Sequence, residues 1–159
     1  MSNPVIKPLL FETYLAMINN AVGSQMFKNG YVEIDGVKTD VLKDGELSCA
    51  IFVSSILSIF NLIDEPHATV KSTVKKMEEA GWQKTEELKP GNILVWGEVD
   101  FGSGDLHSHI GFYVGNDQAV SNNFKTKAIA KHHFKYQGNE LGERAITAIY
   151  THSQFMQHD

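Results

Sequence analysis

The sequence has one cysteine, Cys49, among its 159 residues. A single thiol excludes an intramolecular disulfide and a zinc site built from several thiolates, so Cys49 is either a small buried apolar group or a reactive one. Proline is also scarce, with 4 residues, glycine has 13, and no low-complexity segment is present. This composition excludes linker-like and collagen-like chains and favours a globular protein, which at this length can bury a core without disulfides or metals.

Basic residues are few, 14 against 19 acidic ones, and they form no stripe, so we expect no nucleic-acid partner. The most apolar stretch, Cys49 to Ile63, carries serines and an asparagine and is too short to cross a bilayer as a helix. We therefore expect no membrane partner. No basic segment followed by an uninterrupted apolar run is visible near the amino terminus, which predicts a cytoplasmic protein or one delivered outside by a signal-independent route.

Apolar residues three and four positions apart predict helices in the first half of the chain. We expect an amphipathic helix from Leu9 to about Phe27, a mostly buried helix over 49–63, and a helix over 66–80 that Gly81 stops. The segment 31–47 contains Asp-Gly pairs at 35–36 and 44–45, which indicate a loop or a weak hairpin.

The second half of the chain predicts strands, at 92–96, 109–114, 118–122, 127–134 and 145–150. Helices followed by strands are typical of an α+β domain in which helices pack on an antiparallel sheet. We expect one domain over 1–159, with a helix and loop region at 1–47, two helices at 48–80, the sheet at 88–150 and a tail at 151–159. The sequence leaves the oligomeric state open.

Cys49 lies in the first turn of its predicted helix, where the positive end of the helix dipole favours a thiolate and lowers the thiol pKa. A cysteine nucleophile needs an imidazole as base, and His109 at a strand start is the candidate. The turn at 115–117 returns Ser121 and Asn122 toward His109, where one of them would orient the ring. The two lie on opposite faces of a regular strand; chemistry favours Asn122 and register favours Ser121.

The order of these segments resembles that of the NlpC-type papain-like cysteine peptidases. The residues that carry the likeness are Asp-Gly-Glu-Leu-Ser-Cys at 44–49, Leu-Lys-Pro-Gly-Asn-Ile-Leu-Val-Trp at 88–96 and His-Ile-Gly-Phe-Tyr-Val-Gly-Asn at 109–116. The likeness covers about 46–122, and the segment 144–150 is also similar. It implies a papain-like α+β fold and a thiol hydrolase that cleaves amide bonds of peptides, above all peptidoglycan stem peptides, through an acyl-enzyme.

The resemblance also implies roles for individual residues. Cys49 matches the nucleophile and His109 the base. The third position falls on Ser121, beside Asn122, where the family usually has His, Asn or Gln. A tyrosine upstream of the nucleophile, here Tyr31, would help to bind the oxyanion, and the Cys49 backbone N–H is a further donor.

Ser48 and Ser108 flank the two catalytic positions and are further candidates for oxyanion or substrate binding. The sequence Ser48-Cys49-Ala50 departs from the family's usual Asp-Cys-Ser, which leaves the substrate open. We expect a peptide or a peptidoglycan fragment as the partner.

Two other functions use the same fold: a catalytically silent module that binds peptide or glycan, and an acyltransferase with the same Cys-His pair. A metal site is a further alternative, because His107 and His109 share a strand face and His132-His133 follows. Local rules place only two ligands together, so we expect no metal and no cofactor.

Overall fold

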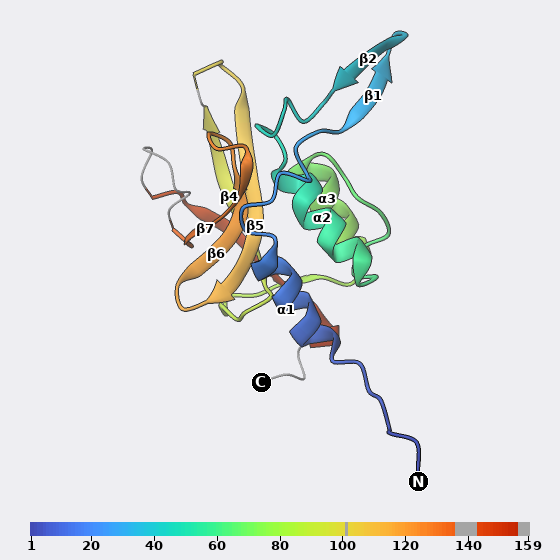
Figure 1. The fold of residues 1–159 in the computed structure, drawn as a ribbon. Helices are drawn as coiled ribbons and strands as arrows, with labels where there is room; N and C mark the ends of the chain where they lie inside the picture. The colour runs from blue at the N-terminus through green and yellow to red at the C-terminus, as the bar shows by residue number, and fades with distance from the viewer. Residues whose placement is uncertain (101, 136–142, 156–159) are drawn as a thin grey trace.

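A computed structural model describes residues 1–100, 102–135 and 143–155 of the chain (Figure 1). It confirms the expected α+β class, with helices preceding an antiparallel sheet. Position 101, segment 136–142 and the last four residues of the predicted tail lie outside the described residues. Within the described ranges, no helix combines the length and the apolar character that crossing a membrane requires.

The first helix, α1 (Leu10–Asn20), is shorter than the predicted 9–27. The chain leaves the helix because Gly23 adopts a φ of +87° and donates its N–H to Ile129 O at 2.7 Å. That bond directs the chain toward the sheet. It joins residues far apart in the sequence, so the apolar periodicity of the helix could not predict it. The prediction of a helix reaching Phe27 was therefore wrong.

Helix α2 (Cys49–Ile59) begins where the sequence predicted and ends earlier than Ile63. Its end has a local cause, because Asn61 takes the left-handed conformation, with φ +55°, and Leu62 N–H bonds back to Leu57 O. Helix α3 (Val70–Glu79) begins later than the predicted start at 66, since the Thr69 side chain caps it by accepting from Ser72 N–H.

Strands β1 (Tyr31–Ile34) and β2 (Val37–Asp40) form a separate hairpin that projects from the body of the molecule (Figure 1). Asp35 and Gly36 both have positive φ, +50° and +80°, which matches the two-residue turn that Asp-Gly favours. The segment predicted as a loop or weak hairpin is thus a hairpin in its first part.

The main sheet has six antiparallel strands in the order β3-β8-β4-β5-β6-β7. Each predicted strand is present, and a short strand that the sequence did not predict, β3, pairs with β8. The strands are β3 (Gln83–Lys84), β4 (Ile93–Asp100), β5 (Leu106–Gly115), β6 (Gln118–Asn123), β7 (Ala128–His133) and β8 (Ile146–Thr151). Asn116 and Asp117, with φ of +52° and +58°, make the turn between β5 and β6.

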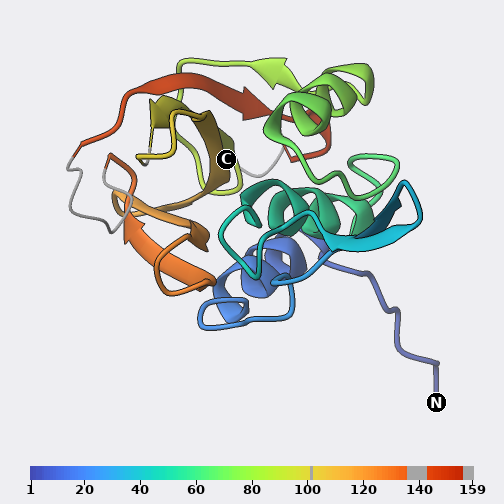
Figure 2. The same cartoon turned by 90° about the horizontal axis from the view of Figure 1, so that it is seen from above.

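The helices pack on one side of the curved sheet, as Figure 2 shows. The main core lies between the helices and the sheet. There the ring of Phe52 on α2 packs edge to face on that of Phe112 on β5, with 5.3 Å between the ring centroids. A smaller cluster covers the other face of the sheet: Leu94, Trp96, Tyr113 and Ala119. This packing holds the N-terminus of α2 against β5, which brings Cys49 and His109 to the same region.

Candidate active site

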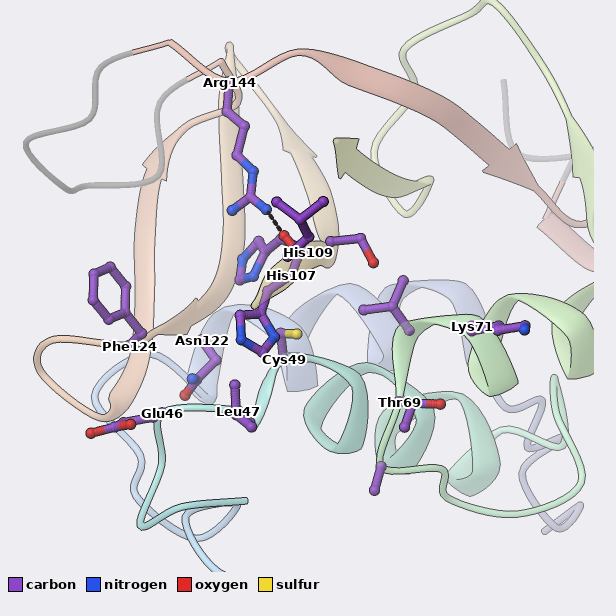
Figure 3. Close-up of a pocket in the computed structure, with 14 residues that line it drawn as sticks. Glu46, Leu47, Cys49, Thr69, Lys71, His107, His109, Asn122, Phe124 and Arg144 are labelled. Carbon is purple, nitrogen blue, oxygen red and sulfur yellow. Dashed lines mark hydrogen bonds between the residues drawn. The ribbon is translucent and has the colours of Figure 1, made fainter. Parts of the chain in front are cut away.

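Cys49 is the first residue of α2 and lines a pocket of about 350 Å³ at the seam between helix and sheet (Figure 3). The pocket mixes apolar and charged side chains from the loop before α2, from the start of α3 and from β5, β6 and the segment before β8. Its lining includes Glu46, Leu47, Thr69, Val70, Lys71, Leu106, His107, Ser108, His109, Asn122, Phe124 and Arg144. The thiol is therefore open to a ligand on one side, although it is largely surrounded by protein.

His109 lies on β5, where it pairs with Trp96 of β4, and its ring contacts the Trp96 indole at 5.3 Å between centroids. Figure 3 shows the imidazoles of His107 and His109 in the same part of the pocket as the Cys49 sulfur. The next residue of the strand, Ile110, directs its backbone N–H toward that sulfur. Strand β5 thus delivers both an imidazole and a hydrogen-bond donor to the thiol.

Burial decides the protonation of this pair. It raises the pKa of the Cys49 thiol, although the N–H groups of Ile110 and Ala50 and the charge of Arg144 favour the thiolate. It also lowers the pKa of His109 well below its usual value, and the positive charges of Arg144 and of His132 in its protonated form lower it further. The expected lowering of the thiol pKa is therefore wrong, because burial outweighs the helix N-terminus. At neutral pH the resting pair is a thiol and a neutral imidazole.

Arg144 is a residue of the site that the sequence did not point to. It is 8 % exposed, precedes β8 and lines the pocket. Its Nε donates to Gly97 O at 2.7 Å and its Nη2 donates to His107 O, which fixes the guanidinium across β4 and β5. The fixed positive charge stabilises a thiolate at Cys49 and disfavours a proton on His109.

The two rival third residues have different partners. Ser121 is 2 % exposed, and its Oγ lies 2.6 Å from Nε2 of His132 on β7. Asn122 is buried too, and its Nδ2 donates to Gly45 O at 2.8 Å. Nε2 of His109 is buried and has no hydrogen-bond partner among the described residues. Neither candidate therefore bonds to the imidazole in this structure.

The three candidates for oxyanion or substrate binding are separated by the fold. Tyr31 lies on the projecting hairpin, is 60 % exposed and has the Lys38 ammonium 4.3 Å above its ring. It does not line the pocket, so its assignment to the oxyanion is not supported. Ser48 is fully buried and does not line the pocket. Ser108 lines the pocket.

Potential metal ligands gather elsewhere in the described part of the chain. The one group of three or more is Asp64, Glu65 and His67, whose ligand atoms lie within 4.8 Å of one another. Two of the three are exposed, and the Lys76 ammonium lies 3.7 Å from Asp64. His107 and His109, which alternation placed on one strand face, belong to no such group within the described ranges.

Comparison with solved structures finds a protein with a similar fold. NlpC2 from Trichomonas vaginalis matches with a TM-score of 0.53 and 16 % sequence identity, over 92 % of this chain and 50 % of that chain. The present chain therefore spans half the length of that protein and has a similar α+β, NlpC-like fold. No family model matches the sequence, and no curated protein matches it.

Proposed function

We propose that this chain is a thiol hydrolase that cleaves amide bonds of peptides, with Cys49 as nucleophile and His109 as base. One observation carries the proposal: the thiol at the start of α2, the imidazole and the Ile110 N–H converge beside one open pocket. A nucleophile, a base and an open space next to both are the minimal parts of acyl transfer through a cysteine. The NlpC-like fold supports the same assignment.

The chemistry follows from the neutral resting pair. His109 takes the thiol proton as the Cys49 sulfur attacks the amide carbonyl, and the developing oxyanion is held by backbone N–H groups at the N-terminus of α2. The imidazolium then gives its proton to the leaving amine, which breaks the C–N bond and leaves a thioester. His109 next removes a proton from water, whose oxygen attacks the thioester and releases the acid and the thiol.

Peptidoglycan stem peptides are the proposed substrates. The pocket supports a peptide that carries both apolar and charged groups, because Leu106 and Phe124 line it together with Glu46 and Lys71. The test is incubation with synthetic stem peptides and mass spectrometry of the products. Wild type should release the two fragments of one amide bond, and Cys49→Ala and His109→Ala should release none while keeping the wild-type circular dichroism spectrum. Cleavage by Cys49→Ala would refute the thiol mechanism.

A second candidate is a catalytically silent module that binds peptide or glycan. It is favoured because Nε2 of His109 has no hydrogen-bond partner in the part of the chain that the structure describes, and a base without an orienting group is a weak catalyst. Under this alternative the stem peptides bind without being cut, and isothermal titration with wild type and Cys49→Ala gives equal affinities. An acyltransferase has no comparable support, because the pocket lining is mixed rather than apolar.

A further inference from the structure

The His109 imidazole needs an acceptor for its buried nitrogen. Nε2 is shielded from water and has no hydrogen-bond partner among the described residues. The nitrogen left for the thiol is therefore Nδ1, and Nε2 carries the proton in the neutral form. A buried N–H without a partner destabilises the folded protein and leaves the orientation of the ring unfixed. An acceptor close to this N–H would remove both disadvantages.

Ser121 packs against β5 at Gly111, two residues beyond His109, because Gly111 has no side chain. A Cβ at Gly111 would lie 2.7 Å from the Ser121 Cβ and 2.9 Å from Val120 O. The strands approach closely at this point, two residues along β5 from His109 on the same face. His109 and His132 both contact the Trp96 indole, at 5.3 and 5.9 Å between centroids, so both imidazoles and the Ser121 hydroxyl gather at one side chain.

The hydrogen bonds of His132 fix which way the Ser121 hydroxyl points. Nδ1 of His132 lies 2.8 Å from His133 O, and a carbonyl can only accept, so Nδ1 carries the proton. In the neutral ring Nε2 is then an acceptor, and Ser121 Oγ at 2.6 Å must donate to it. The lone pairs of the Ser121 oxygen remain for another donor. A hydroxyl without this fixed direction would as readily donate toward His109 as accept from it.

We infer that Ser121 and His132 form one positioning unit for His109, in which His132 accepts from the Ser121 hydroxyl and the Ser121 oxygen accepts from Nε2–H of His109. The inference rests on the proposed function and adds His132 to it as a positioning residue. The bond to His109 closes when the thiol proton passes to the ring, because the imidazolium is a stronger donor than the neutral imidazole and hydrogen bonds of catalytic groups are commonly long in the resting state. No proton leaves Ser121: the unit orients the ring and stabilises the imidazolium that forms.

The unit explains how serine serves at a position where a direct acceptor is expected. A lone serine hydroxyl rotates freely and orients an imidazole poorly. With His132 behind it, the hydroxyl has one direction and its oxygen is a stronger acceptor, because hydrogen bonds in a chain polarise one another. Ser121 is 2 % exposed, so water does not compete for this oxygen.

The test measures the rate at which iodoacetamide labels Cys49 at pH 7, which requires no substrate. Ser121→Ala and His132→Phe should each slow labelling roughly tenfold, and the double variant should be no slower than either single one, because all three break the same chain. His133→Phe is the matched control, since its side chain alternates to the other face of β7, and it should label like wild type. With a cleaved peptide in hand, kcat should fall and KM should stay unchanged.

The outcomes separate this inference from the proposed function. If Ser121→Ala and His132→Phe label like wild type while His109→Ala is slow, the positioning unit is refuted and the Cys-His pair stands. If His109→Ala also labels like wild type, both fall. Should the variants fail to fold, the imidazole 15N shifts of the wild-type protein decide: a protonated Nδ1 on His132 and a protonated Nε2 on His109 support the unit, and a protonated Nε2 on His132 overturns it.

Discussion

The backbone N–H of Ile110 faces the sulfur of Cys49, so the strand that carries the base also contacts the nucleophile. Cys49 lies on α2 and Ile110 on β5, and their contact depends on how the helix packs on the sheet. The site is therefore a property of this packing rather than of a single loop. Changes that shift α2 against β5 should affect the thiol before they unfold the protein.

The lowered pKa of His109 predicts a loss of stability in acid. A buried imidazole that stays neutral binds fewer protons than the same group in the unfolded chain, whose pKa is about 6.5. The free energy of unfolding should therefore decrease as the pH falls below about 6.5 and continue to decrease until the folded-state pKa is passed. Urea unfolding of wild type and His109→Gln at pH 7 and pH 5 tests this. The decrease should be smaller in His109→Gln, and an equal decrease would contradict it.

Arg144 should matter for both stability and thiol chemistry. Arg144→Met removes the bonds to Gly97 O and His107 O, and we expect a loss of about 2 kcal/mol in unfolding free energy. It also removes a charge that favours the Cys49 thiolate, so the thiol pKa should rise further. Alkylation rates against pH measure the second effect. Arg144→Lys keeps the charge without the planar fork, so it should retain more of the thiol reactivity than of the stability.

The Asn122 amide should prove structural. Its bond to Gly45 O ties β6 to the loop that leads into α2, and the bond is buried. Asn122→Asp keeps the shape of the side chain but places an acceptor against the Gly45 carbonyl. We therefore expect the free energy of unfolding to fall by about 1 to 3 kcal/mol. Thermal unfolding measures it. Alkylation of Cys49 at a temperature where the variant is folded should stay within a few-fold of wild type; a far larger fall would make Asn122 part of the catalytic machinery.

Asp40 should hold the loop before the nucleophile helix. Its carboxylate accepts from the N–H groups of Gly30, Leu42 and Asp44 and from the Asn29 amide, which lowers its pKa to about 2. This contribution to stability is present above pH 3.8 and is lost as the pH falls toward 2. In Asp40→Ala the three amides should exchange hydrogen faster than in wild type. Unchanged exchange at these amides would show that the carboxylate does not hold the loop.

Local sequence patterns predicted that Cys49 begins a helix and that His109 lies on a strand, because each depends on its own element, but the strand begins at Leu106 and not at His109. A serine-cysteine step before an apolar run marks a helix start, and alternating apolar residues around a glycine mark a strand. The fold class followed from the order of such elements. The hairpin turns were also local, since Asp35-Gly36 and Asn116-Asp117 take the left-handed conformations that their residue types favour.

The rest of the site depends on contacts that are distant in the chain. Arg144 lines the pocket of the thiol because β8 pairs with β4, and His132 contacts Ser121 because β7 pairs with β6. No periodicity of either segment records which strand will be its neighbour. The early end of α1 has the same cause, since the N–H of Gly23 bonds to Ile129 on β7. The family resemblance predicted that Tyr31 helps to bind the oxyanion. In the structure Tyr31 lies on the projecting hairpin, away from the pocket.

The most direct test of the Cys49–His109 pair is the rate of iodoacetamide labelling from about pH 5 to 9 in wild type and His109→Ala. When the imidazole takes the thiol proton, the reactive thiolate forms without a change in net protonation, so the wild-type rate should be nearly constant across neutral pH. His109→Ala should label at least about tenfold more slowly at pH 7, with a rate that rises with pH as for a thiol of raised pKa. The same rate and the same pH dependence in both proteins would show that the two residues do not act together.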